Sequence, residues 1–279
     1  MQEDDRQAGA ALEIMQPGSG RHALPYRGAA STAAGGQGER HMGRELDLSQ
    51  PGTSHGTPLL EQCGARCKVV NRAYRLVAGC ISVAGLALQF WLMAHYPSSK
   101  SLLTTATQFF SFFTIQTNVL IAASMLLPAI MPGTRLSQLL SNASIRTAVL
   151  AYALLTALVY FALLRNIGHD DGLERRADQI LHYVTPALFF FDWLAFVAKG
   201  QVPFRAVPRF LIYPALYVAW IFFYGGLTGW YAYPFVNAKR LDLWHLATNF
   251  IGLVFVALAI PYALVALDRL LTTVRRQRA

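Results

Sequence analysis

Three apolar stretches of this sequence carry hydroxyl, imidazole and amide side chains at helical spacing. They are Thr114-x-x-Thr117-Asn118, His182-x-x-Thr185-Pro186 and His245-x-x-Thr248-Asn249. Residues three and four positions apart share one face of a helix. Since an unpaired polar group is costly in an apolar surrounding, we expect the three faces to converge on one cavity. A hydroxyl that meets an imidazole there would form the pair that nucleophilic catalysis uses.

Each of these side chains also has a purely structural interpretation. A Thr in an apolar helix commonly donates to the carbonyl four residues earlier, an Asn bridges helices, and a His at a helix end, such as His245, lies at the membrane surface. His182 differs because it lies inside an apolar stretch, titrates near neutral pH and precedes Pro186, which frees a backbone carbonyl. We take His182 as the candidate base, and Thr114 stays open between a nucleophile and a packing residue.

Asp192 is the only acid within the apolar stretches. A carboxylate in lipid needs a partner or a proton. Asp192 lies about 15 Å from His182 along a helix axis, at 1.5 Å per residue, so it cannot orient that imidazole as a helical neighbour. We expect Asp192 to bridge helices or to be protonated, and any third member of a Thr and His site to come from elsewhere.

The residues that we expect to contact a substrate lie on these same helices or in the segment Thr228–Phe235. They are Gln116, Thr117, Asn118, Thr185, Asp192, Tyr231, Tyr233, His245 and Asn249. Aromatic rings with a polar end favour membrane interfaces. Tyr231 and Tyr233 therefore either roof the cavity or belong to an interfacial belt of aromatic residues.

Six apolar runs position these side chains, and each is close to the 20 residues that cross a bilayer. The runs are 76–94, 106–127, 147–164, 180–198, 210–228 and 245–267, and none contains Lys or Arg. In lipid the backbone must satisfy its own hydrogen bonds, so runs of this length predict helices. The predicted fold is all-α: a polytopic membrane protein with six transmembrane helices in one bundle.

The distribution of basic residues predicts the orientation of this bundle. Thirteen Lys and Arg residues lie before the first run, in the second and fourth loops and after the last run, whereas six lie in the other loops. Basic residues accumulate on the cytosolic side of membrane proteins. The sequence therefore predicts a multi-pass protein of the plasma membrane with both termini in the cytosol and an outward-facing cavity.

The composition predicts four regions. Residues 1–58 are rich in Gly, Ala, Ser and Gln and show no apolar periodicity, which predicts a disordered tail. A basic juxtamembrane segment (59–73), the six-helix domain (74–268) and a basic tail (269–279) follow. The net charge of +9 lies between apolar runs, so we expect membrane lipids rather than nucleic acid as partners. No phosphate loop or metal-ligand motif occurs, so no cofactor or metal is expected.

Three segments resemble one known family. Phe112–Asn118, Leu181–Trp193 and Thr228–Phe235 are similar to the androgen-induced and androgen-dependent TFPI-regulating proteins and their bacterial relatives, over about residues 74–268. This resemblance implies six helices and cytosolic termini. It also implies a threonine hydrolase that cleaves fatty acid esters of hydroxy fatty acids, with its Thr and His at Thr114 and His182.

The resemblance implies a specific mechanism. His182 would accept the hydroxyl proton of Thr114, which would attack the ester and form an acyl-enzyme that water resolves. Asn118, Gln116 or the pair Tyr231 and Tyr233 would donate to the oxyanion. The competing hypothesis is a non-catalytic lipid or small-molecule binding protein, or a carrier that couples Asp192 and His182 to protons. The sequence predicts neither a clear inverted repeat nor a pair of broken helices, the features that are typical of carriers.

Overall fold

The computed structural model describes residues 58–95, 101–165 and 172–277, and this part of the chain is helical without a strand. The chain divides into Met1–Ser54 and His55–Ala279. The predicted tail lies outside the described residues, except for Pro58, and all described residues belong to the second unit.

The described helices follow one another through short connections. They are α1 (Pro58–His95), α2 (Leu102–Phe110), α3 (Phe113–Ile130), α4 (Arg135–Ser141), α5 (Ala143–Val159), η1 (Tyr160–Leu164), α6 (Leu173–Gln179), η2 (Ile180–Val184), α7 (Thr185–Phe196), η3 (Phe204–Leu211), α8 (Ile212–Thr228), η4 (Pro234–Val236) and α9 (Leu243–Gln277). The elements η1 and η2 are π turns, and η3 and η4 are 3₁₀ turns.

Five of the described helices are long and apolar enough to cross a membrane, consistent with an integral membrane protein. They are Lys68–His95, Phe113–Ile130, Ala143–Leu164, Phe204–Thr228 and Leu243–Val274. The run expected at 180–198 begins with the π turn η2, which follows α6, and continues as α7, a helix of 12 residues. The number of six transmembrane helices therefore stays a prediction.

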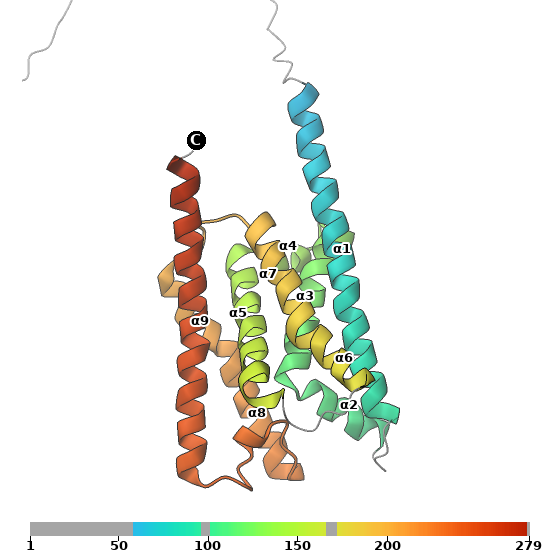
Figure 1. Ribbon diagram of the computed structural model, residues 1–279, viewed down its shortest axis with the longest axis vertical. Helices are drawn as coiled ribbons and strands as arrows, with labels where there is room; N and C mark the ends of the chain where they lie inside the picture. The colour runs from blue at the N-terminus through green and yellow to red at the C-terminus, as the bar shows by residue number, and fades with distance from the viewer. Residues whose placement is uncertain (1–57, 96–100, 166–171, 278–279) are drawn as a thin grey trace, which may run out of the picture. The chain divides into compact units, whose positions relative to one another are not determined.

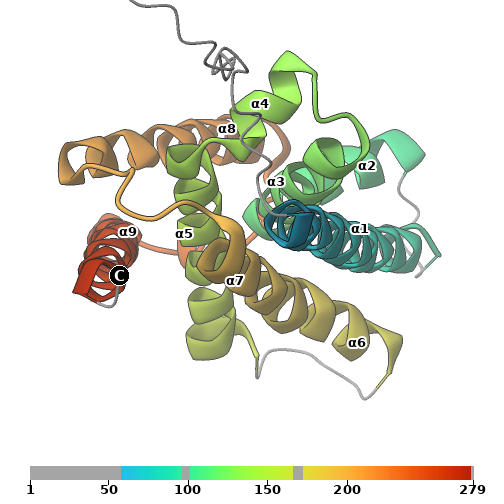
Figure 2. The same cartoon turned by 90° about the horizontal axis from the view of Figure 1, so that it is seen from above.

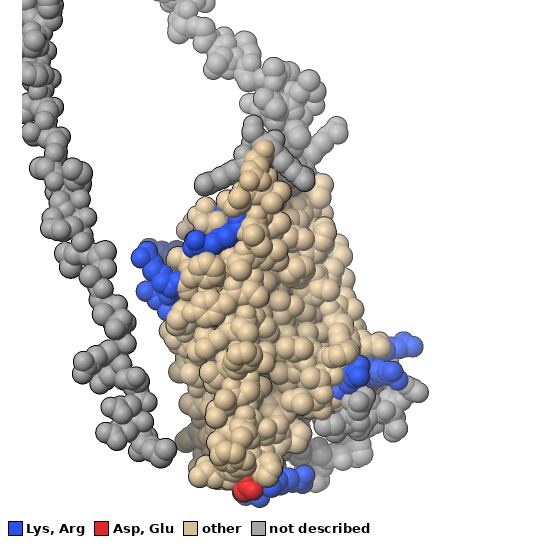
Figure 3. Space-filling view, turned by 60° about the vertical axis from the view of Figure 1, so that its left-hand side comes forward, with Lys and Arg blue, Asp and Glu red and all other residues tan. Residues whose placement is uncertain are grey.

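The helices form a bundle in which α3 and α5 are central. In Figures 1 and 2, α1 runs along α3, and α5 lies between α3, α7 and α9. The outer surfaces of α8 and α9 are apolar; Leu216, Ile251 and Phe255 are between 66% and 71% exposed. Figure 3 shows Lys and Arg gathered toward two ends of one face, with a broad uncharged surface between them. Such a surface is suited to lipid.

The helix expected over 106–127 is broken, which corrects the prediction of one continuous helix. It ends at Phe110 and begins again at Phe113, with Phe112 in an extended conformation. Ser111 stabilises the break through partners on α8: its carbonyl accepts a hydrogen bond from Tyr217 (3.2 Å), and its hydroxyl accepts one from Trp220 (3.0 Å). These long-range partners satisfy backbone and side-chain groups that a continuous helix would bond locally.

Asp192 bridges helices, which is one of the two roles expected for it, but its partner Arg146 departs from the prediction. Arg146, expected in a loop, lies in the first turn of α5 and is 1% exposed. It pairs with one oxygen of Asp192 on α7, and Arg75 on α1 pairs with the other at 2.7 Å. The Arg146 guanidinium also donates to the carbonyl of Ser124 at 2.7 Å. The buried carboxylate thus joins α1, α5 and α7.

Gly79 on α1 allows this helix to pack closely against α3. A Cβ atom at Gly79 would lie 2.5 Å from Leu126 and 3.2 Å from the Met125 Cβ. Because small residues allow membrane helices to approach closely, we expect Gly79→Leu to destabilise the bundle by about 1–3 kcal/mol through overpacking. Thermal unfolding in detergent measures this loss.

The matched control for this substitution is Gly252→Leu on α9, because a Cβ at Gly252 meets no described atom within 4 Å. We expect it to leave the unfolding temperature nearly unchanged. Equal losses in the two variants would contradict a close contact between α1 and α3.

Candidate functional site

Thr114 lies in the first turn of α3, directly after the break. The first amide groups of a helix have no partner within it, and the N-cap residue of α3, Phe112, makes no side-chain hydrogen bond to them. The amide of Thr114 donates instead to the phenol oxygen of Tyr233 at 3.3 Å. The helix dipole also places positive potential at this end. Thr114 thus occupies a position where developing negative charge is stabilised.

His182 lies in the π turn η2, which joins α6 and α7. Single π turns within α-helices are frequent at functional sites. The ring Nδ1 lies 3.0 Å from the backbone carbonyl of Asp178, and Nε2 lies 3.2 Å from the Thr114 hydroxyl. Because a carbonyl only accepts, Nδ1 carries the proton in the neutral ring and Nε2 is the acceptor. This tautomer is the one that a general base toward Thr114 requires.

Asn118 connects the helices that carry these two residues. Its side-chain amide donates to the carbonyl of Thr114 at 2.9 Å and to the carbonyl of Leu181, the neighbour of His182, at 3.1 Å. The backbone carbonyl of Asn118 accepts a hydrogen bond from the Ser82 hydroxyl on α1 at 3.2 Å. Since both donors of the Asn118 amide are engaged, we assign it a positioning role and not the predicted contact with an oxyanion.

Two residues of the site, Asp178 and Tyr160, were not predicted from the sequence. A carboxylate oxygen of Asp178 lies 3.7 Å from Nδ1 of His182, and the Tyr160 hydroxyl donates to the other oxygen at 3.4 Å. The Tyr160 ring stacks on the imidazole, with centroids 4.0 Å apart. Asp178 precedes His182 by four residues, so the helical spacing in the sequence could have identified it. Tyr160 belongs to η1, and only the packing of the two π turns reveals it.

Tyr233 is the aromatic residue that enters the site from the segment Thr228–Phe235. Its hydroxyl lies 3.4 Å from the Thr114 hydroxyl and is buried. Burial raises the pKa of the Tyr233 phenol above its ordinary value near 10, so the phenol stays protonated at neutral and mildly alkaline pH. Asn249 on α9 supports this segment by donating to the carbonyl of Phe235 at 2.9 Å.

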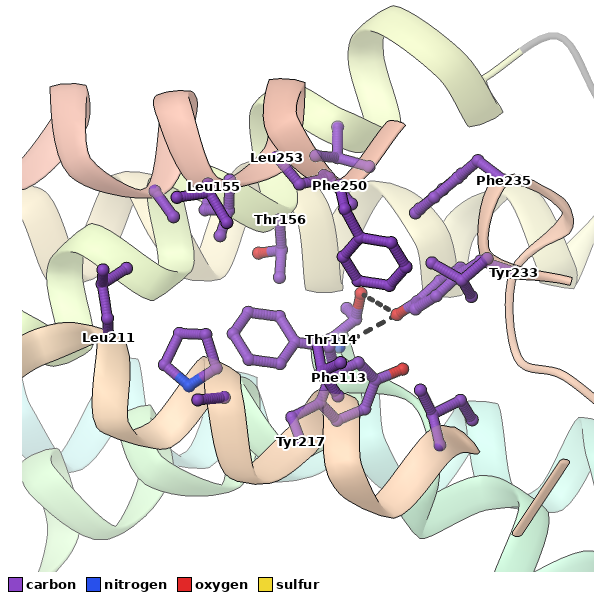
Figure 4. Close-up of a pocket in the computed structure, with 18 of the residues that line it drawn as sticks. Phe113, Thr114, Leu155, Thr156, Leu211, Tyr217, Tyr233, Phe235, Phe250 and Leu253 are labelled. Atoms are coloured by element: carbon purple, nitrogen blue, oxygen red, sulfur yellow. Dashed lines mark hydrogen bonds between the residues drawn. The ribbon is translucent and has the colours of Figure 1, made fainter. Parts of the chain in front are cut away.

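Two cavities meet at Thr114 and Tyr233. The larger has a volume of about 350 Å³ and an almost entirely apolar wall formed by α3, α5, α8 and α9. Figure 4 shows Phe250, Leu253 and Leu155 around this space, with the Thr114 hydroxyl bonded to Tyr233 at its edge. The smaller cavity, about 190 Å³, has a larger polar share in its wall, because His182, Asp178 and Tyr160 line it. Thr114 therefore lines both an apolar cavity and a more polar one.

The other predicted contact residues line neither cavity, which corrects the expected convergence of three polar faces. They are Gln116, Thr117, Asn118, Thr185, Asp192, Tyr231, His245 and Asn249. Gln116 bridges the carbonyl of Phe110 and the hydroxyl of Tyr213. His245 is exposed at the start of α9 beside Asp242. Polar groups on helices pair locally or with the nearest helix, so a shared height in the membrane does not require a shared cavity.

Hydrogen bonding to the amide of His245 lowers the pKa of Asp242, as for a carboxylate that caps a helix N-terminus. His245 therefore belongs to the cap of α9. Within the described residues, no group of three or more His, Cys, Asp or Glu side chains is placed to hold a metal ion.

The arrangement around Thr114 has the parts of a nucleophilic centre. A hydroxyl is within hydrogen-bond reach of an imidazole acceptor, a backbone carbonyl orients the imidazole, and a buried phenol and a helix N-terminus face the hydroxyl. Comparison of the chain with family models, with curated proteins and with solved structures gives no match in any of the three.

Proposed function

We propose that this chain is an integral membrane hydrolase that cleaves lipid esters through an acyl-enzyme on Thr114. The observation that carries this proposal is the 3.2 Å contact between the Thr114 hydroxyl and Nε2 of His182 at the mouth of an apolar cavity. Cavities of about 300–1,000 Å³ with apolar walls and few polar groups are typical of small-molecule sites. An acyl chain suits the larger cavity, and the ester group would lie at Thr114.

The first half of the reaction transfers the acyl group. Nε2 of His182 accepts the proton of Thr114, and the Thr114 oxygen bonds to the ester carbonyl carbon. The tetrahedral oxyanion accepts a hydrogen bond from Tyr233, whose oxygen already accepts one from the Thr114 amide. The carbon–oxygen bond to the alcohol then breaks, and the alcohol takes the proton from His182.

The second half returns the enzyme to its starting state. A water molecule gives its proton to His182 and attacks the acyl-Thr114 ester, after which the fatty acid leaves and Thr114 regains its proton. Asp178 and Tyr160 hold the ring of His182 in place during both halves. Water would reach the ester through the smaller cavity, where His182 and Asp178 lie.

The resemblance to the androgen-induced and androgen-dependent TFPI-regulating proteins supports fatty acid esters of hydroxy fatty acids as the substrate class. The excess of basic residues on the opposite end supports a site that faces away from the cytosol of a plasma-membrane protein. A carrier is less well supported, because Asp192 contacts two Arg side chains and lines neither cavity at Thr114.

Covalent labelling tests the proposal. The full chain, purified in detergent, is treated with a fluorophosphonate probe, and the labelled peptide is identified by mass spectrometry. We expect the Thr114 oxygen to displace fluoride and carry the label, and fatty acid esters of hydroxy fatty acids to slow labelling. A chain that neither reacts nor releases fatty acid would leave only a lipid-binding role.

Tyr233→Phe tests the oxyanion donor. We expect kcat to fall by about 10²-fold, because removal of one oxyanion-hole donor costs 10²–10³ in rate. Tyr231→Phe is the matched control, because Tyr231 packs its ring near Gly225 on α8 and lines neither cavity. We expect its kcat to stay near that of the wild type. A similar loss in both variants would remove Tyr233 from the mechanism.

A further inference from the structure

A separate polar cavity lies at the opposite end of the bundle from Thr114. It has a volume of about 480 Å³ and is lined by α1, the first turn of α5 and the end of α7, including Arg75, Arg146, Asn71, Ser144 and Gln201. In Figure 1 the start of α5 and the end of α7 lie at the upper end of the bundle, near α4. None of the described lining residues is Asp or Glu.

The charges around this cavity do not balance. Asp192 does not line the cavity. One of its oxygens pairs with Arg75 and the other with Arg146, so two guanidinium groups share one carboxylate. Arg146 is 1% exposed, and its Nε has no hydrogen-bond partner among the described residues. The helix dipole of α5 adds positive potential where its first turn meets the cavity. A buried charge of this kind requires a counter-charge or further hydrogen bonds.

We propose that this cavity binds a phosphate group, either as free inorganic phosphate or as the headgroup of an anionic lipid. Arg side chains recognise phosphate with paired donors in a fixed plane. Ser144 and Gln201 supply further polar groups around the cavity, and Asn142, whose Oδ1 caps α5, contributes its side-chain NH₂ group. An anion there would neutralise the excess positive charge of Arg75, Asp192 and Arg146, at the end of the bundle where basic residues predominate. This site is independent of the hydrolase proposal.

Thermal unfolding of the full chain in a neutral detergent tests this proposal. The probes are inorganic phosphate and dihexanoyl phosphatidic acid at constant ionic strength, with chloride and dihexanoyl phosphatidylcholine as controls. We expect a saturable rise in unfolding temperature, since a ligand that binds only the folded state stabilises it. A rise with inorganic phosphate identifies the free anion as sufficient, and a rise with phosphatidic acid alone identifies a lipid headgroup.

Two substitutions in the cavity wall should remove this effect. Arg75→Gln should weaken the binding of phosphate by about 10- to 100-fold, the size of a lost charged hydrogen bond. Ser144→Asp places a carboxylate in the wall and should abolish binding, although an acid in the first turn of α5 favours the folded helix. The second variant therefore separates loss of binding from loss of folding.

The matched controls are Ser144→Asn, which is neutral, and Arg72→Gln, which removes an exposed charge of α1 outside the cavity. We expect both to bind within about twofold of the wild type, as surface substitutions usually do. The proposal is overturned if neither probe raises the unfolding temperature, or if the Ser144→Asp chain responds as the wild type does.

Discussion

We expect Thr114→Val to abolish fluorophosphonate labelling and to lower the rate of ester hydrolysis by at least about 10³-fold, as the loss of a member of a catalytic unit does. Val has the shape of Thr and lacks only the hydroxyl, so the packing of this residue, which is 7% exposed, is kept. The lost atom is the one that lies 3.2 Å from Nε2 of His182. Rates of fatty acid release from membranes that contain equal amounts of each chain measure the effect.

Two further Thr variants make this result specific. Thr114→Ser retains a hydroxyl and should keep measurable labelling. Thr156→Val removes the other Thr hydroxyl on the wall of the apolar cavity, which donates to the carbonyl of Ala153 at 2.8 Å, and should leave the rate close to that of the wild type. Hydrolysis by Thr114→Val at the wild-type rate would rule out the acyl-enzyme.

The second large effect concerns stability. We expect Asp192→Leu to destabilise the bundle by about 3–5 kcal/mol, because removing one partner of a buried ion pair leaves an uncompensated charge. The charge left behind is that of Arg146, whose side chain is 1% exposed, while Arg75, at 13%, is closer to the surface. The unfolding temperature and the yield of monodisperse protein in detergent measure the loss.

A double variant distinguishes the ion pair from a simple change of packing. In Arg146→Met with Asp192→Leu, both charges are replaced by apolar groups, and most of the lost stability should return, since well-packed apolar residues often replace buried ion pairs without cost. Asp242→Asn at the exposed N-cap of α9 should change the unfolding temperature little. If the double variant were less stable than Asp192→Leu alone, the ion cluster would not be the cause.

The apolar runs are the part of the fold that local sequence predicts well. Each helix bonds its own backbone, so length and composition within one segment are enough to identify it, and five of the six predicted runs correspond to described helices able to cross a membrane. The sequence did not predict where two of these runs are interrupted, at Ser111–Phe112 and at the π turn η2. The break at Ser111–Phe112 contains neither Gly nor Pro, and it depends on Tyr217 and Trp220, which are distant in the sequence.

The sequence by itself determined which segments are apolar helices and singled out Thr114, His182 and Tyr233 as side chains with possible chemistry, because these properties follow from residue type and local spacing. Only the tertiary structure decided which groups meet. It paired Thr114 with His182, added Asp178 and Tyr160, and placed Asp192 against Arg75 and Arg146 at the other end. The physical reason is that side-chain pairing depends on how helices rotate and approach, and those contacts arise between residues far apart in the chain.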